Sequence, residues 1–353
     1  MYGWGLNILD QFVQDRGALL NWIADAEPPA VVVMDGQNTA QSIRVVSPST
    51  TVIHRAYNPN DHRWHEVISP LDWLNGHAGL AVGGVVLQTL NEPHGYTDLR
   101  SLARWSAELM ALAAAQNIRL CLPNWGVGHP DSNRIIAGEL DELFRAFDRF
   151  PMHLYGVHEY AQQSAVDERP YRIGRFLDSF HRMDALGLKR PRVIATEAGR
   201  DVGGGRSDGW RGAGWSEPQY VQFLNGYRDL YRAYNISACI FCYGNGADGQ
   251  WSSFNVEGAG TVLRALIDWN QEVVSGDDMV FVRKPLVTYA LNMRASPMVG
   301  NNLVSSVGPN QPVRLLEANV SNGWININND GVAGYVSLQT NLAFEQQVKV
   351  TAA

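Results

Sequence analysis

The stretch GGVVLQTLNEP, residues 83–93, decides the fold because it reads as one apolar strand that stops at a carboxylate. A near-continuous run of valine and leucine is typical of a strand that is buried on both faces, as in a parallel sheet. Pro93 biases the backbone before it toward extended conformations, which would aim the side chain of Glu92. We therefore expect Asn91 and Glu92 at the carboxyl end of a buried parallel strand.

Seven similar apolar runs accompany this one: GWGLNI (3–8), AVVVMD (30–35), TTVIHRAY (50–57), IRLCLPN (118–124), HLYGVHEY (153–160), RVIATE (192–197) and SACIFCYG (237–244). Segments with helical periodicity lie between them, at 10–26, 62–76, 98–116, 132–149, 169–186, 217–234 and 259–271, and QNTAQSIRVV (37–46) has the weakest pattern. Eight strand–helix units in this length predict an α/β fold of the (β/α)8 or TIM-barrel type. The alternative, a doubly wound sheet, would need a glycine-rich turn after the first run, and GLNILDQF has none.

The pattern changes from about Gly276, where short apolar runs alternate with turn signals that contain glycine, proline and asparagine. Such spacing predicts a small all-β barrel. The segment resembles a bacterial-type SH3 domain through its N-x-R-x-x-P opening at 292–297, its G-W-x-x-I strand at 323–327 and its G-Y-V-S close at 334–337. We expect three parts: a barrel at 1–275, a linker at 276–288 and an SH3-like domain at 289–353. The resemblance implies a cell-wall or other ligand for the last part, with a plain packing module as the alternative.

Composition and charge exclude several classes of partner. The chain has 353 residues, of which 45% are hydrophobic, and a net charge of −7 without a block of lysine and arginine. This balance argues against nucleic acid or an anionic membrane as a partner. No apolar run approaches the roughly 18 residues of a membrane helix. The start MYGWGLNILDQF lacks the basic and apolar regions of a signal peptide, and the cellular location stays open.

The three cysteines, Cys121, Cys239 and Cys242, lie within apolar runs that read as strands. We expect them to be buried free thiols, because no disulfide framework or zinc spacing is present. His62 and His65 are likewise not expected to bind a metal, since no carboxylate lies at ligand spacing. The sequence therefore predicts neither a metal nor another cofactor.

Two glutamates end runs that lie almost opposite each other in such a barrel. Glu92 ends the fourth run and Glu197 ends the seventh. Chemistry in (β/α)8 barrels takes place at the carboxyl ends of the strands. Two carboxylates across a cleft can share glycosidic bond hydrolysis, about 5–5.5 Å apart for retention of configuration and about 6.5–9.5 Å for inversion.

The combination of Asn91-Glu92-Pro93 in the fourth run, His158-Glu159-Tyr160 in the sixth and Glu197 in the seventh resembles clan A glycoside hydrolases, which are retaining (β/α)8 enzymes. The resemblance spans residues 1 to about 272 as an architecture with short, scattered motifs. It implies that Glu92 is the acid/base and Glu197 the nucleophile. It also implies an oligo- or polysaccharide substrate, with a β-linkage as the default.

Supporting roles follow from the same resemblance. Asn91 would hold the 2-hydroxyl of the substrate, and His158 would line the site near the acid/base. Tyr160 would donate a hydrogen bond to Glu197 and keep it ionised. Trp251 matches the approximate place of a tryptophan that lies under the scissile sugar in the clan, with ordinary loop packing as the alternative.

Two further candidates come from the strand ends. Arg55 ends the third run and could balance the negative charge of Glu197, whereas its neighbour His54 would point the opposite way. A salt bridge on the helix side of the barrel is the alternative for Arg55. Trp125 ends the fifth run and could act as a stacking platform for a sugar ring.

These observations lead to two hypotheses. The first is a retaining O-glycosyl hydrolase that works by double displacement. The second is a non-catalytic carbohydrate- or cell-wall-binding protein on a TIM-barrel scaffold. The pairing of two strand-end glutamates with Tyr160 favours the enzyme, because sugar binding alone does not require that combination.

Overall fold

The computed structural model describes residues 2–93, 98–169, 171–203 and 205–272, and beyond them six strands within 279–337. The chain divides into two compact units, Met1–Gln271 and Glu272–Ala353.

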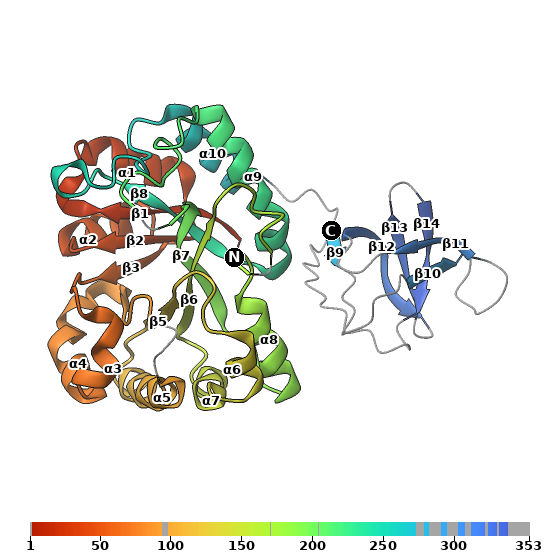
Figure 1. Cartoon of the computed structure of the whole chain (residues 1–353), viewed down its shortest axis with the longest axis horizontal. Coiled ribbons are helices and arrows are strands. Elements are labelled where there is room, and N and C mark those ends of the chain that lie inside the picture. The colour runs from red at the N-terminus through yellow and green to blue at the C-terminus, as the bar shows by residue number, and fades with distance from the viewer. Residues whose placement is uncertain are drawn as a thin grey trace. The chain divides into compact units, whose positions relative to one another are not determined.

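Eight parallel strands close into a barrel in the first unit, in sequence order (Figure 1). They are β1 (Gly3–Leu9), β2 (Ala30–Met34), β3 (Thr51–Arg55), β4 (Val86–Gln88), β5 (Leu120–Trp125), β6 (Leu154–Ala161), β7 (Arg192–Arg200) and β8 (Ser237–Tyr243). The last strand pairs with the first, which closes the cylinder. The predicted (β/α)8 barrel is therefore confirmed.

Helices surround the barrel: α1 (Arg16–Ala26), α2 (Gln37–Val46), α3 (Trp64–Val67), α4 (Pro70–His77), α5 (Leu99–Ala115), α6 (Ser132–Ile136), α7 (Asp141–Arg149), α8 (Phe176–Ala185), α9 (Glu217–Tyr234) and α10 (Gly260–Gln271). Short 3₁₀ turns lie at Asp10–Phe12, Asp61–Arg63, Ala78–Leu80, Val82–Gly84 and Ala247–Gly249. The helix predicted over 132–149 is two helices, because Gly138 turns the chain with a φ of 76°. Within the described residues, every helix is too short or too polar to cross a bilayer.

The stretch around β4, residues 83–93, departs from expectation at both ends. Gly83 and Gly84 have φ values of 70° and 80°, so β4 begins only at Val86. Glu92 has a φ of 48°, in the left-handed region, and the prediction of an extended backbone before Pro93 was wrong. The Glu92 N–H donates to the carbonyl oxygen of Asn124 at 2.9 Å, and this bond to β5 holds the turn.

Two layers of hydrophobic core support the barrel. Inside the cylinder, strands β2 to β8 contribute one apolar cluster: Ala30, Val32, Ile53, Val86, Cys121, Leu154, Ile194 and Cys239. A larger cluster fills the space between strands and helices. All three cysteines are free and buried, as predicted. The filled interior leaves no open pore, and functional side chains of such barrels lie at the carboxyl ends of the strands.

The second unit contains an antiparallel six-stranded sheet in the order β11-β10-β14-β13-β12-β9. Its strands are β9 (Met279–Phe281), β10 (Leu291–Arg294), β11 (Leu303–Val307), β12 (Pro312–Ser321), β13 (Trp324–Asn329) and β14 (Val332–Ser337). β9 falls inside the segment predicted as a linker, and it pairs with β12. The rest of the predicted linker lies outside the described residues, and the SH3-like type of 289–353 stays a prediction.

Candidate active site

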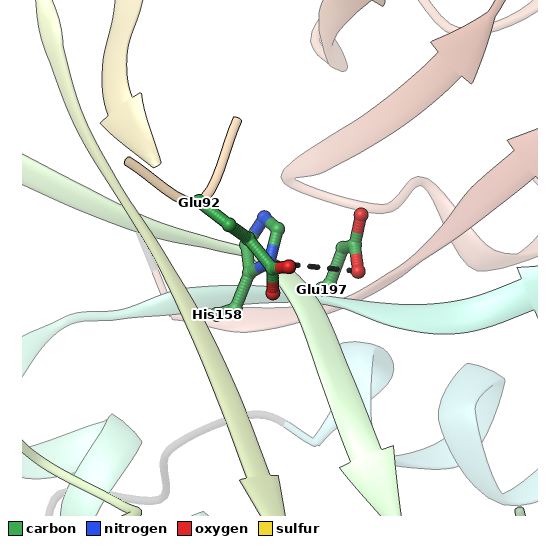
Figure 2. Close-up of side chains that lie close together, drawn as sticks. All are labelled: Glu92, His158 and Glu197. Carbon is green, nitrogen blue, oxygen red and sulfur yellow. Dashed lines mark hydrogen bonds and ion pairs between the residues drawn. The ribbon is translucent and has the colours of Figure 1, made fainter. Parts of the chain in front are cut away.

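Glu92 and Glu197 meet at the carboxyl end of the barrel. One carboxylate oxygen of each, together with a ring nitrogen of His158, forms a group in which all three atoms lie within 4.8 Å of one another. Figure 2 shows the three side chains facing one another. The Glu197 side chain is buried at 10% exposure, whereas that of Glu92 is 50% exposed. The structure thus brings the two predicted carboxylates together.

A β-bulge in β7 aims Glu197 at this group. Ala195 pairs with Val157, but the next pair joins Glu197 to His158, so Thr196 has no counterpart on β6. An extra residue of this kind bends a strand and redirects the side chain that follows it. The bulge therefore sets Glu197 beside His158 at the rim of the barrel.

Both oxygens of Glu197 accept hydrogen bonds. The Tyr160 hydroxyl donates to Oε2 at 2.8 Å, and Nη1 of Arg55 donates to Oε1 at 3.2 Å. Burial and the charge of Glu197 hold the pKa of Tyr160 well above its ordinary value, so its hydroxyl stays a donor. Two donors, one of them cationic, stabilise an ionised Glu197.

Arg55 is itself held by a second carboxylate. Its Nη2 donates to Oδ2 of Asp61 at 3.0 Å, and both side chains are buried. Burial raises the pKa of Asp61, although the nearby Arg55 opposes the shift. Arg55 thus lies between two carboxylates in the barrel mouth. The alternative of a salt bridge on the helix side is not what the structure shows.

His158 lies between the two glutamates. Its Nδ1 lies 2.8 Å from Oε1 of Glu92 and 3.5 Å from Oε2 of Glu197. Burial opposes a charge on the ring, but the negative charge of Glu197 and the hydrogen bond to Glu92 outweigh burial, so the pKa of His158 is raised. Nδ1 of His158 can donate to an ionised Glu92 or, in the neutral ring with its proton on Nε2, accept from a protonated Glu92.

Asn124 ties together the segments that carry the two glutamates, and the sequence did not single it out. Its amide nitrogen donates to the Leu90 carbonyl oxygen at 2.8 Å, two residues before Glu92. Its Oδ1 accepts from the Thr196 hydroxyl at 3.1 Å, one residue before Glu197. Asn124 is fully buried and has a φ of 58°. One side chain therefore bridges the β4 turn and the β7 bulge.

The remaining predicted residues are placed differently. Asn91 is half-buried, and its Oδ1 accepts from Nε2 of Gln88 at 3.1 Å, so its contact with a sugar stays a prediction. Trp125 is 1% exposed, and this burial disfavours the predicted stacking role. Trp251 is half-buried and packs edge-on against Phe241, with ring centroids 5.3 Å apart.

Phe241, at the end of β8, is the aromatic ring next to the site on that side. Its centroid lies 6.4 Å from that of Tyr160, in an edge-to-face arrangement. Phe241 therefore contacts both Tyr160 and Trp251. From the sequence, Trp251 was named after the eighth run, and Phe241 within that run was not singled out.

Glu92, His158 and Glu197 together offer the oxygen and nitrogen atoms that a cation site uses. Among the described residues, no other group of three or more such side chains lies close enough together to hold a metal ion. Glu197, however, already bonds to Arg55 and Tyr160 through its two oxygens. A guanidinium at 3.2 Å would repel a metal ion bound to the same carboxylate. The arrangement therefore fits acid–base and nucleophilic work better than metal binding.

Comparisons with known proteins give the fold. No family model matches the chain, and a search of curated proteins finds no match. Similar solved structures include an endo-beta-1,4-glucanase from Xanthomonas axonopodis pv. citri with a triple mutation, at 11% identity and a TM-score of 0.53, covering 77% of this chain and 100% of that chain.

Two further similar structures have lower TM-scores. The catalytic domain of a mannanase from Streptomyces sp. SirexAA-E is 15% identical, with a TM-score of 0.46 and coverage of 77% of this chain and 88% of that chain. An endo-1,4-beta-D-mannanase from Thermotoga petrophila is 9% identical, with a TM-score of 0.48 and coverage of 77% and 99%. At such identities the likeness to the glucanase concerns the fold alone: the chain has the eight-stranded barrel architecture of that enzyme.

Proposed function

We propose that the chain is a retaining glycoside hydrolase that cleaves an O-glycosidic bond by double displacement. The observation that carries the proposal is the group of Glu92, His158 and Glu197 atoms within 4.8 Å of one another at the barrel rim. The nearest oxygens of the two carboxyl groups are therefore closer than the roughly 6.5–9.5 Å that separates the carboxyl groups of an inverting enzyme, which must hold a water molecule between them and the sugar. The spacing supports the retaining route, for which about 5–5.5 Å is usual.

In the first step, a Glu197 oxygen attacks the anomeric carbon while Glu92 donates its proton to the glycosidic oxygen, and the leaving group departs. A glycosyl ester on Glu197 results. In the second step, ionised Glu92 takes a proton from water, which attacks the anomeric carbon and releases Glu197. The two inversions give net retention.

The assignment of the two roles rests on their surroundings. Glu197 is buried and accepts from Arg55 and Tyr160, which favours the ionised form that a nucleophile needs. The side chain of Glu92 is half exposed, so it can reach a leaving group and exchange its proton with solvent. The substrate class, an oligo- or polysaccharide with a β-linkage, belongs to the same proposal, and a cell-wall ligand for residues 289–353 stays a prediction.

Substitution of either glutamate tests the proposal. We expect Glu92→Gln and Glu197→Gln each to lower kcat by at least about 10²-fold, since each removes a group that acts in the transition state. Hydrolysis of a panel of nitrophenyl β-glycosides and polysaccharides measures the loss. Glu142→Gln, which changes an exposed glutamate on α7, should keep full activity.

Azide separates the two roles. In Glu92→Ala, azide should partly restore turnover of a dinitrophenyl glycoside, because this leaving group needs no acid and azide needs no base. The product should be a glycosyl azide of retained configuration. Unchanged hydrolysis in either glutamine variant would end the assignment. Sugar binding without hydrolysis by the native chain would favour the non-catalytic alternative.

A further inference from the structure

Two tyrosine rings are exposed at the rim that carries the carboxylates. Tyr57 is 58% exposed and Tyr171 is 61% exposed. Tyr57 follows β3 and Tyr171 follows β6, so both belong to loops at the carboxyl ends of strands. A tyrosine ring offers an apolar face and a polar tip, which suits the alternating apolar and hydroxyl surfaces of a sugar.

Tyr57 lies on the side of the proposed nucleophile. The guanidinium carbon of Arg55 is 5.9 Å from the centre of the Tyr57 ring, and the same guanidinium donates to Glu197. The Tyr57 N–H donates to Oδ1 of Asp35 at 2.7 Å, which fixes the backbone of the tyrosine at the end of β2. The exposed ring therefore has a defined place beside the group that holds Glu197.

Tyr171 lies on the side of the proposed acid/base. The loop that follows β5 touches both residues: a Cβ added at Gly126 would lie 3.4 Å from the Glu92 side chain, and one added at Gly128 would lie 3.0 Å from the Tyr171 ring. The guanidinium carbon of Arg175 is 5.6 Å from the centre of that ring. A single short loop thus separates Tyr171 from Glu92.

We propose that Tyr57 and Tyr171 are stacking platforms for sugars on the two sides of the scissile bond, and that the chain cleaves polysaccharides internally. The inference rests on the proposed function. The acid/base stands beside the leaving group and the nucleophile beside the sugar that is retained. Tyr171 therefore contacts leaving-group sugars and Tyr57 contacts the retained part of the chain. Platforms on both sides require sugars on both sides, which an internal segment of a polymer supplies.

The mode of cleavage is measured on four soluble polymers: carboxymethylcellulose, galactomannan, xylan and laminarin. On the polymer that is cleaved, viscosity should fall early, while few reducing ends have formed. Tyr57→Ala and Tyr171→Ala should each raise KM on that polymer by about tenfold, the effect expected from the loss of one stacking ring. Val45→Ala removes an exposed side chain from the last turn of α2 and should leave KM unchanged.

A glycosyl fluoride of the polymer's repeating disaccharide separates the two sides, because it places no sugar in the leaving-group position. Tyr57→Ala should lower kcat/KM for this fluoride, whereas Tyr171→Ala should not. Release of sugars from chain ends only, or an unchanged KM in both variants, would overturn the inference and leave the proposed function intact. If the native chain hydrolyses neither polymers nor fluorides, the proposed function fails and this inference fails with it.

Discussion

At the scale of single residues, one buried, neutral side chain bonds to both segments that carry the glutamates. The Asn124 side chain donates to the Leu90 carbonyl oxygen and accepts from the Thr196 hydroxyl. Its backbone carbonyl oxygen accepts from the Glu92 N–H. We expect Asn124→Ala to lower kcat by about tenfold or more, because a displacement of about 1 Å at a reacting group is costly. It should also lower the free energy of unfolding by about 1–3 kcal/mol per polar group left unpaired. Steady-state kinetics and urea unfolding measure the two effects.

The matched control is Ser179→Ala, which removes a buried hydrogen bond of 2.9 Å to Tyr155, away from the two glutamates. That variant should lose stability and keep kcat. The pH profile of kcat in Asn124→Ala should also change, because the coupling of two carboxylates depends on their separation. A native kcat and pH profile in Asn124→Ala would show that Asn124 serves stability alone.

The sequence was sufficient to predict that Glu92 and Glu197 come together at strand ends with Arg55 beside Glu197, and their roles stay a proposal. It could not predict Asn124 or Asp61 as parts of the site. Asn124 acts through β4 and β7, which are distant in sequence, and it is the extra residue of a bulge in β5 that no pattern of apolar residues reveals. Asp61 lies in a short 3₁₀ turn, where an acidic residue would ordinarily be read as exposed.

At the scale of secondary structure elements, β6 leaves a gap that Asn124 fills. A Cβ added at Gly156 would lie 2.0 Å from Oδ1 of Asn124 and 3.1 Å from Sγ of Cys121. We expect Gly156→Ala to displace the amide of Asn124, to lower the free energy of unfolding by about 1–3 kcal/mol through overpacking, and to lower kcat as well. Urea unfolding and steady-state kinetics on the same preparations measure these changes.

The comparison variant is Gly76→Ala within α4, where an added Cβ meets nothing within 4 Å. An alanine inside an exposed helix should stabilise the chain by about 0.5–1 kcal/mol. Equal stability of the Gly156→Ala variant and the native chain would contradict a tight fit between β6 and Asn124.

The eight strands could be predicted because each is buried on both faces and therefore reads as an apolar run. The ends of elements were less predictable, because glycines at positive φ decide them. Gly83 and Gly84 shorten β4, and Gly138 separates α6 from α7. The left-handed Glu92 could not be anticipated, since its conformation follows from a hydrogen bond to β5 rather than from its neighbour Pro93.

At the scale of the whole molecule, one buried acid makes the stability of the barrel depend on pH. Glu159 is 1% exposed, accepts from the Gly174 N–H at 2.8 Å and accepts from the Tyr231 hydroxyl at 3.0 Å. Burial raises the pKa of Glu159 to about 8, and these two hydrogen bonds only partly oppose the shift. At neutral pH this carboxyl therefore keeps its proton in the folded state.

The sign of the effect follows from proton binding. The pKa of a glutamate in the unfolded chain is about 4.3. Between that pH and about 8 the folded chain therefore holds a proton that the unfolded chain has lost. The contribution of Glu159 is fully present below the lower value and is lost as pH rises toward the upper one. Its slope is up to about 1.4 kcal/mol per pH unit.

Glu159→Gln cannot ionise, and its free energy of unfolding should therefore fall less steeply with pH than that of the native chain. Urea unfolding of both proteins at several pH values between 5 and 8 measures the two slopes, and Glu142→Gln on the surface of α7 should keep the native slope. Glu159 lies between His158 and Tyr160 on β6, so loss of its proton would place a buried negative charge next to two residues of the candidate site. If the free energy of unfolding fell equally steeply with pH in the native chain and in Glu159→Gln, the Glu159 carboxyl would have an ordinary pKa and would not be protonated in the folded state at neutral pH.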